Sequence, residues 1–236
     1  MKEIFDKMYI DTADSFYNIC KNDLLNNKKR FIITANPESF MLCEKDEELM
    51  SALLSNESTV VPDGIGVVKA SRILNYNIKE RITGIDISYK LLEYANEYGL
   101  GLYLFGAKQE VIDKLTKVIE SDYCNIKLLG STNGYVKDKD IVFDEIVKLK
   151  PDIVLVALGI PAQEKLIYKH LNKFKKGIFL GVGGSFDVIS GYKKRAPKIF
   201  IKTNTEWLYR IACEPKRLKR FWNNNVKFIF NVKKYK

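Results

Sequence analysis

Residues 153–164 read Ile-Val-Leu-Val-Ala-Leu-Gly-Ile-Pro-Ala-Gln-Glu, an apolar run followed by a glycine turn and the start of a helical pattern. A strand that is apolar on both faces is typical of a parallel sheet covered by helices. Five further β-rich runs occur along the chain, at 31–35, 59–61, 101–105, 126–129 and 177–181. Helical patterns alternate with them, near 11–26, 38–55, 64–75, 86–98, 108–121, 139–149, 162–174 and 186–191. The alternation predicts an α/β domain with a mostly parallel sheet flanked by helices.

The composition is that of an ordinary globular chain. It has 236 residues, 46% hydrophobic and 29% charged, enough for one large or two small cores. No apolar stretch approaches the ~18 residues that cross a bilayer, and the first residues do not form a basic segment followed by an apolar one. We therefore expect a protein that is neither exported nor membrane-spanning. Four scattered cysteines and a single histidine, His170, argue against a zinc site and favour reduced thiols in the cytosol.

The positive charge of the chain is concentrated near its C-terminal end. Residues 192–236 hold 14 of the 39 lysines and arginines and 2 of the 29 acids, a balance of +12. Residues 1–191 are left with 25 basic and 27 acidic groups, a balance of −2. A basic tail on a near-neutral body implies an anionic partner for the tail: a phosphate-bearing ligand, a nucleic acid or an acidic membrane surface.

The same tail has an amphipathic helical pattern from Lys198 on, and Pro215 is expected in the first turn of a new helix. Apolar residues recur there at three- or four-residue steps among lysines and arginines: Leu218, Phe221, Trp222, Val226, Ile229 and Val232. Such a segment can lie in lipid headgroups, where each surface Lys or Arg adds up to about 1 kcal/mol against anionic lipid. The alternative interpretation is a helix packed on its own domain with a solvated basic face.

Polar groups follow the first two predicted strands, at the edge where parallel sheets bind their ligands. Thr34 and Asn36 emerge after the first run, and Asn36 is either a ligand contact or only the N-cap of the next helix. Asp63 follows the second run, beside two glycines that leave the backbone open. A carboxylate at this place is well positioned as a general base, although an N-capping aspartate gives the same pattern.

The later strand ends carry groups that suit a phosphate-bearing ligand. Arg81 can meet a phosphate with two hydrogen bonds, or it can pair with Asp86. Gly106 and Ala107 stand at a strand-to-helix switch, where free amides and the helix dipole attract phosphate. Gln163, after the most hydrophobic strand, can bind a sugar or a uracil through its amide.

Two further patterns match known cofactor or metal motifs only in part. Residues 181–187, Gly-Val-Gly-Gly-Ser-Phe-Asp, only partly match a dinucleotide-binding fingerprint, because Phe186 stands where a third Gly or Ala is required. This argues against NAD. Asp138 and Asp140 have a spacing that sugar-nucleotide enzymes use for a metal, but they precede a helix, so capping is the preferred interpretation. The sequence thus predicts no metal site and no cofactor.

Seven blocks occur in order between about Phe31 and Phe221: 34–36, 62–68, 81–86, 159–164, 181–187, 195–197 and 206–210 through 214–215. Each block alone is weak, whereas seven in order are specific. Together they resemble the WecG/TagA/CpsF family of bacterial glycosyltransferases. The resemblance implies a Rossmann-like α/β catalytic domain over residues 1–191 and a basic, helical, membrane-associating appendage over residues 192–236.

The resemblance also implies an activity. The family moves N-acetylmannosamine, or a related sugar, from UDP to undecaprenyl-diphosphate-linked N-acetylglucosamine, with inversion, without a metal or cofactor, for teichoic acid or another surface glycan. The expected partners are the UDP-sugar donor, the polyprenyl-diphosphate-linked acceptor and an anionic membrane surface, with no nucleic acid. Assembly of the chain into a homo-oligomer is left as an open alternative. The expected location is cytoplasmic, peripheral on the inner face of the cell membrane.

The site residues that the resemblance implies come from both parts of the chain. Asp63 corresponds to the catalytic base, and the arginines of the appendage that belong to the catalytic set are Arg210, Arg217 and Arg220. The substrate-binding residues are Thr34 and Asn36 at the donor sugar, then Arg81, Gly106, Ala107, Gln163, Gly183 and Gly184. The types of residue also fit this chemistry independently of the resemblance. A sugar hydroxyl needs a carboxylate to accept its proton, and arginines can neutralise a leaving diphosphate.

Two other functions fit parts of the sequence. A nucleic-acid-binding protein with a basic C-terminal arm would explain the net charge of +10. Against it, the aromatic residues of the tail fall at helical core spacing and do not form a stacking platform. A nucleotide-dependent enzyme of another reaction type, such as an NAD enzyme, would explain the glycine-rich strand ends.

Overall fold

The computed structural model describes residues 1–234, except for the side chains of Arg217 and Arg220. Within this part of the chain, six parallel strands form one sheet in the order β2-β1-β6-β5-β3-β4. The strands are β1 (Lys29–Ala35), β2 (Ser58–Pro62), β3 (Gly101–Gly106), β4 (Lys127–Thr132), β5 (Ile153–Ala157) and β6 (Gly177–Gly181). The predicted α/β class with a parallel sheet is confirmed.

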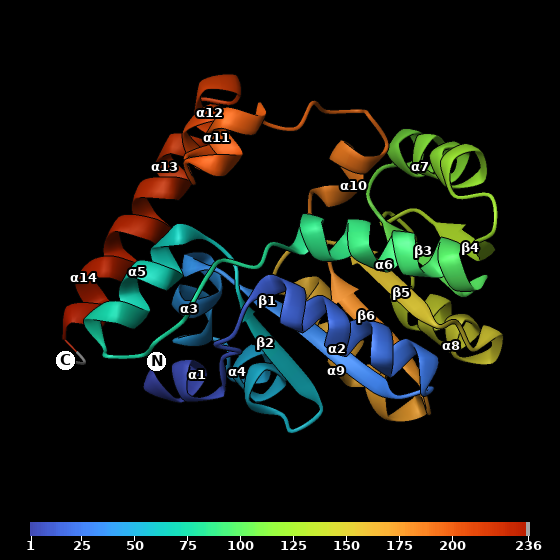
Figure 1. Ribbon diagram of the computed structural model, residues 1–236, viewed down its shortest axis with the longest axis horizontal. Helices are drawn as coiled ribbons and strands as arrows, with labels where there is room; N and C mark the ends of the chain where they lie inside the picture. Colours follow the sequence, from blue (N-terminus) through green and yellow to red (C-terminus); the bar gives the residue numbers. More distant parts are fainter. Residues whose placement is uncertain (235–236) are drawn as a thin grey trace.

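Helices cover both faces of the sheet, because alternate strand residues point to opposite sides (Figure 1). Phe31 and Ile33 belong to one buried cluster, and Ile32 between them belongs to the other. The first cluster includes residues of α1 (Lys2–Lys7), α3 (Pro37–Cys43), α4 (Glu47–Leu54), α5 (Ile65–Ile73), α8 (Lys139–Leu149) and α9 (Ala162–His170). The second includes residues of α2 (Ala13–Leu25), α6 (Gly84–Tyr98), α7 (Gln109–Asp122) and α10 (Ser185–Ile189).

Three helices differ from the sequence prediction. The helix expected over 38–55 is two helices, because the Asp46 side chain caps α4 by accepting a hydrogen bond from the backbone N–H of Leu49 (3.0 Å). The helix expected over 162–174 ends at His170 and continues as a short 3₁₀ turn. Helix α1 has no counterpart in the prediction, and buried Ile4 and Phe5 attach it to the core.

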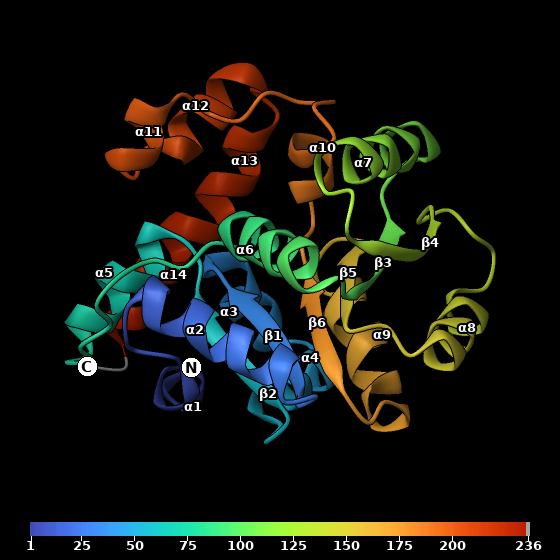
Figure 2. The same ribbon diagram turned by 45° about the vertical axis from the view of Figure 1, so that its right-hand side comes forward.

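The tail forms further short helices that lead away from the body and back to it. They are α11 (Lys198–Lys202), α12 (Glu206–Cys213), α13 (Arg217–Phe221), the π-helical turn Trp222–Val226 and α14 (Lys227–Lys233). The segment that leaves α10 crosses to α11 and α12, which stand away from the sheet, and α13 and α14 return toward α5 (Figures 1 and 2). The helix predicted from Pro215 begins at Arg217.

The last helix of the tail is part of the hydrophobic core. Phe228 and Val232 are fully buried, whereas Leu218 and Trp222 are 54% and 62% exposed. The interpretation of a helix packed on its own domain is therefore confirmed for α14. The exposed apolar side chains before it leave membrane binding as a prediction, and so does the domain boundary at residue 191.

The described part of the chain has no helix both long enough and apolar enough to cross a lipid bilayer. All four cysteines are free thiols: Cys20 and Cys43 are buried, and Cys124 and Cys213 are exposed. Burial raises the pKa of the Cys20 and Cys43 thiols to about 12. Only Cys124 and Cys213 are therefore accessible to reagents.

Candidate active site

The candidate site lies beyond the carboxyl ends of β1 and β2. In the register of these strands Ala35 stands opposite Pro62, and the backbone N–H of Asp63 donates to the Ala35 carbonyl oxygen (2.9 Å). Thr34 and Asn36 flank Ala35 on β1 and just after it. The sheet thus brings Thr34, Asn36 and Asp63 together at one edge.

The Asp63 side chain is partly buried and does not cap the helix that follows it. The N-cap of α5 is Gly64, whose φ of 102° favours glycine, so the capping interpretation of Asp63 is wrong. The backbone of Gly84, the first residue of α6, hydrogen-bonds to the Asp63 carboxyl. Burial raises the pKa of Asp63 to about 6, although the charges of Arg81 and Arg210 lower it. Such a carboxyl is ionised at pH 7 and is a stronger base than an ordinary aspartate.

The two β1 residues differ in how the fold uses them. The Asn36 side-chain oxygen accepts hydrogen bonds from the backbone N–H groups of Glu38 and Ser39 (2.9 and 3.1 Å), so the N-cap interpretation is confirmed. A sugar contact through its side-chain nitrogen stays a prediction. Thr34 packs against Gly84, where an added Cβ would lie 3.4 Å from the Thr34 methyl group. The absence of a side chain at Gly84 lets the start of α6 approach β1.

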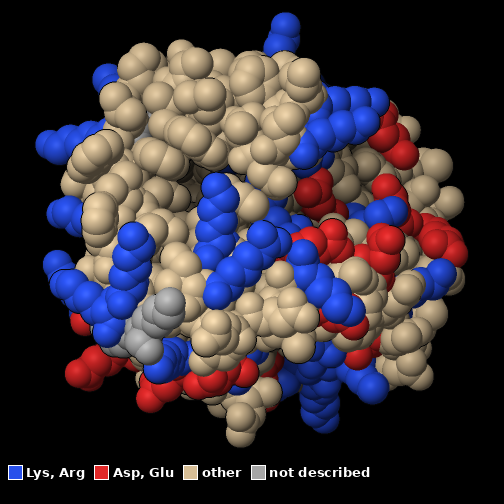
Figure 3. Space-filling model, turned by 60° about the vertical axis from the view of Figure 1, so that its left-hand side comes forward, with Lys and Arg blue, Asp and Glu red and all other residues tan. Residues whose placement is uncertain are grey.

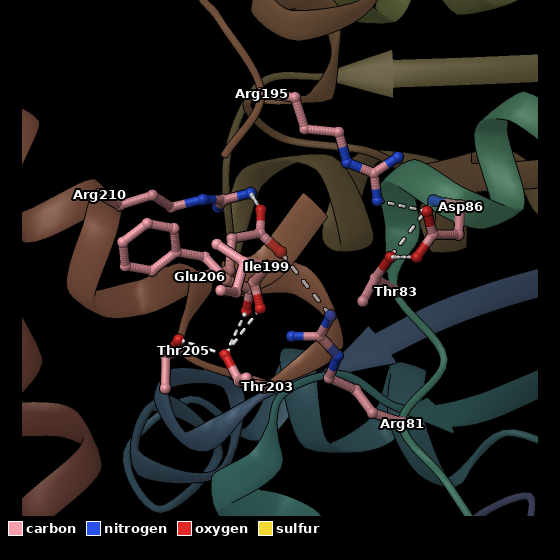
Figure 4. A network of polar contacts seen from close by, with 10 residues as sticks. Arg81, Thr83, Asp86, Arg195, Ile199, Thr203, Thr205, Glu206 and Arg210 are labelled. Atoms are coloured by element: carbon pink, nitrogen blue, oxygen red, sulfur yellow. Dashed lines mark hydrogen bonds and ion pairs between the residues drawn. The ribbon is translucent and has the colours of Figure 1, made fainter. Parts of the chain in front are cut away.

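Glu206 lies between two arginines from distant parts of the sequence (Figure 4). Its Oε1 accepts a hydrogen bond from Arg210, one turn further along α12. Its Oε2 lies 3.7 Å from Nη2 of Arg81, which precedes α6 in the body. These ion pairs connect the tail to the body. They also keep the Arg81 and Arg210 guanidinium groups near enough to Asp63 to lower its pKa.

A second ion pair connects the tail to the start of α6. Asp86 pairs with Arg195, so the predicted alternative of an Arg81–Asp86 pair is wrong. The other Asp86 oxygen accepts a hydrogen bond from the hydroxyl of Thr83 (2.5 Å), whose side chain also caps α6. Figure 4 shows the Asp86–Arg195 pair and the Glu206–Arg81 pair, each of which joins a residue of the tail to a residue of the body.

Gln163 is buried and holds together the loops that follow β5 and β6. Its Oε1 accepts hydrogen bonds from the backbone N–H groups of Gly159 and Gly183, both 3.1 Å long. Its Nε2 donates to Oε1 of Glu164 (2.8 Å). A contact between Gln163 and a ligand stays a prediction. In this structure the residue shapes the edge of the sheet.

The predicted glycine contacts have two different surroundings. Gly183 and Gly184 face open space, because an added Cβ would meet nothing within 4 Å. At Gly106 (φ 123°) a Cβ would lie 2.3 Å from the Ala157 carbonyl oxygen, so packing on β5 requires glycine. The backbone N–H of Ala107 donates to that same oxygen (2.8 Å), and is therefore not free for a phosphate. Gly106 ends β3, four strand spacings from β2, or about 19 Å along the edge.

Arg217 and Arg220 lie in α13, and their side chains are outside the described part of the structure. Asp138 caps α8 by accepting hydrogen bonds from two backbone N–H groups, so the capping interpretation is confirmed. Among the residues that the structure describes, no three or more His, Cys, Asp or Glu side chains gather into a possible metal site.

Comparison with known proteins identifies the family of this chain. Residues 6–236 match the glycosyl transferase WecG/TagA/CpsF family. The chain belongs to this family. A relative from Bacillus subtilis (strain 168) is 42% identical over 207 residues, which cover 87% of this chain and 80% of the relative. A relative from Staphylococcus aureus (strain NCTC 8325 / PS 47) is 37% identical with the same coverage.

Both relatives are named N-acetylglucosaminyldiphosphoundecaprenol N-acetyl-beta-D-mannosaminyltransferase, as is a relative from Bacillus spizizenii that is 40% identical over 194 residues, 82% of this chain and 75% of that protein. The family resemblance is thus confirmed, and this WecG/TagA/CpsF-family protein is a hexosyltransferase.

Two buried carboxyl groups of this family member were not among the predicted site residues. Glu206 stands in a basic segment, and its i,i+4 spacing to Arg210 is the signal that could have singled it out. Glu164 is 2% exposed, and its Oε2 has no hydrogen-bond partner among the described residues. Burial raises the pKa of Glu164 to about 7. Its neighbour Gln163 drew attention in the sequence, whereas nothing there marks Glu164 as buried.

Proposed function

We propose that this protein transfers N-acetylmannosamine, or a related sugar, from UDP to undecaprenyl-diphosphate-linked N-acetylglucosamine in the synthesis of teichoic acid or another surface glycan. One observation carries the proposal: the Asp63 carboxyl lies at the carboxyl edge of the sheet, where the charges of Arg81 from the body and Arg210 from the tail act on it. The names of the relatives support the choice of sugar and acceptor.

Asp63 is proposed as the general base. A sugar hydroxyl titrates far above pH 7, so it needs a carboxylate that takes its proton as the new bond forms, a contribution of about 10² to 10⁴ in rate. The acceptor oxygen forms a bond to the anomeric carbon while the bond from that carbon to the UDP oxygen breaks. A single displacement of this kind inverts the configuration of the anomeric carbon, and it needs one base and no second carboxylate nucleophile.

Arginines are proposed to stabilise the leaving diphosphate in place of a metal ion. Negative charge grows on UDP as the sugar departs, and fixed guanidinium groups can stabilise that charge without reorganising. Arg81 and Arg210 approach Glu206 from opposite sides (Figure 4). The roles of Arg217 and Arg220 in the same field follow from the family resemblance.

The donor is proposed to lie along the carboxyl edge of the sheet. Thr34 at the end of β1 and Asn36 just after it lie at the same edge as Asp63 and would hold the sugar. The open backbone of Gly183 and Gly184, held by Gln163, lies next along the edge after β6. Gly106 and Ala107 stand beyond β5 and would line the nucleotide end.

The tail is proposed to bind the anionic inner face of the cell membrane, where the lipid-linked acceptor lies. Figure 3 shows the face that carries the tail: its upper part, where α11 to α13 lie, is largely free of charged side chains, and lysines and arginines surround it. In the tail, Ile199, Leu218 and Trp222 are each more than half exposed. Apolar side chains ringed by cations suit a peripheral contact with headgroups.

The decisive experiment is mass spectrometry of the product formed from UDP-N-acetylmannosamine and a synthetic lipid-diphosphate N-acetylglucosamine. We expect a lipid-linked disaccharide, with the β configuration by NMR, at an undiminished rate in EDTA. Loss of the rate in EDTA would overturn metal independence, and retention of configuration would overturn direct displacement. Binding of NAD or RNA without binding of UDP would overturn the whole proposal.

A further inference from the structure

Glu206 is a carboxylate in an unusual place. It is one of only two acids in residues 192–236, which carry 14 basic side chains, and it is 5% exposed. A buried charge is costly unless it is paired. Glu206 meets this requirement with two partners, because one oxygen pairs with Arg210 and the other faces Arg81.

The side chains of the two arginines differ in exposure: Arg81 is 13% exposed and Arg210 is 49% exposed. A guanidinium has five N–H donors in a rigid fork. Glu206 approaches the Nη2 atom of Arg81 with one oxygen and the Nη2 atom of Arg210 with the other. Because the carboxylate lies between the two cations, it offsets their mutual repulsion and holds both in one orientation, as Figure 4 shows.

We propose that Glu206 is a positioning residue that holds Arg81 and Arg210 in a fixed arrangement for the donor diphosphate, so that the tail helix α12 becomes part of the donor site. This inference rests on the proposed function, since it takes the diphosphate of a nucleotide sugar as the ligand. Two arginines presented at a set separation bind two linked phosphates with less loss of side-chain freedom than two free arginines do. Removal of the carboxylate therefore weakens binding of the diphosphate even though it increases the net positive charge.

The charge and the reach of Glu206 can be separated experimentally. The groups that face Asp63 are Arg81 and Arg210, which lower its pKa, and Glu206, which raises it. Glu206→Gln removes the charge, so the acid limb of the rate profile should move to lower pH. Glu206→Asp keeps the charge and shortens the side chain, so the limb should stay in place. In both variants the donor KM should rise, by about 10- to 100-fold for a misplaced positioning group.

The test combines calorimetric titration of UDP into the full chain with steady-state kinetics from pH 5 to 8. The matched control is Glu214→Gln, which makes the same charge change in the tail at a residue that pairs with exposed Lys193. We expect weaker UDP binding in both Glu206 variants, a limb shift in Glu206→Gln alone, and neither change in the control. Thermal unfolding checks that each variant is folded, and Glu206→Asp carries the binding test if Glu206→Gln does not fold.

The outcomes separate this inference from the proposed function. If the wild type binds no UDP and makes no disaccharide, the proposed function itself is wrong. If the wild type is active and the Glu206 variants bind UDP as tightly as it does, Glu206 only fastens the tail and the inference is wrong. A limb that stays in place or moves to higher pH in Glu206→Gln also contradicts it.

Discussion

The ring of Phe228 in α14 packs against the ring of Phe40 in α3, with centroids 4.9 Å apart. The last helix of the tail is therefore anchored in the hydrophobic core of the body, although α11 and α12 before it stand away from the sheet. Phe228→Ala should lower the free energy of unfolding by about 3–5 kcal/mol, because it opens a cavity at a fully buried site. Phe230→Ala in the same helix is the control, since Phe230 is 64% exposed and its loss should cost less than about 0.5 kcal/mol. Equal melting temperatures for the two variants in calorimetry would contradict the packing.

Because α14 is part of the core, removal of residues 192–236 should destabilise the body as well as abolish transfer.

Asp63→Asn should fold and lose about 10²- to 10⁴-fold in turnover, because an amide cannot accept the proton of the sugar hydroxyl. Its melting temperature should rise, since the variant no longer buries a carboxylate. Product formation and UDP binding are measured on the same preparation. Undiminished turnover would remove Asp63 from the role of base, whereas lost UDP binding would show a role in holding the donor.

The rate should depend on pH through Asp63. Burial raises the pKa of Asp63 to about 6, and the base works only when ionised, so kcat/KM should be constant above pH 7 and fall about tenfold by pH 5. Arg81→Gln removes a charge that lowers the pKa of Asp63, so kcat/KM of this variant should begin to fall at a higher pH than kcat/KM of the wild type. A limb centred near pH 4 in the wild type would mean that the working base is an ordinary, solvated carboxylate.

Glu164 should make stability depend on pH. Burial raises the pKa of Glu164 from 4.5 to about 7 in the folded protein. Between these values the unfolded chain has released a proton that the folded protein keeps, so each rise in pH lowers the free energy of unfolding. Urea denaturation at pH 4.5 and 7.5 should show a loss about 3 kcal/mol greater in the wild type than in Glu164→Gln. Exposed Glu48→Gln is the control, and parallel pH dependence in all three proteins would refute the assignment.

Membrane binding should depend on exposed apolar residues of the tail. The double variant Leu218→Ser, Trp222→Ser should sediment at least about tenfold less with phosphatidylglycerol vesicles, because a buried Leu side chain alone contributes about 1.5–3 kcal/mol. Both residues are more than half exposed, so the fold should be retained. Tyr135→Ser is the control, since Tyr135 is 76% exposed and lies outside the tail. Unchanged sedimentation of the double variant would show that the tail does not use these side chains.

The sheet could be predicted from the sequence because each strand is a local apolar run and each strand end carries its own turn. The same reasoning placed Asp63 and Thr34 at strand ends, where the structure brings them together. Local patterns also gave the caps at Asn36 and Asp138. These features depend on neighbours within a few residues.

The ion pairs could not be predicted in this way, because a charged side chain chooses its partner by position in the folded chain. Asp86 stands close to Arg81 in sequence, yet it pairs with Arg195, while Arg81 faces Glu206. The burial of Glu164 was hidden for a similar reason. A carboxylate can be buried on a helix that looks half polar in sequence when the helix packs against both a sheet and another helix, as α9 packs against β1, β6 and α4.

The distribution of the four thiols has a practical use. Cys124 lies just after α7 and Cys213 ends α12, so the two reactive sulfur atoms stand on the body and on the tail. Spin labels attached to both would measure the separation of the two parts in the natural sequence, with no cysteine introduced or removed. Pulsed electron resonance with and without lipid vesicles would then report directly whether the tail swings when it meets a bilayer.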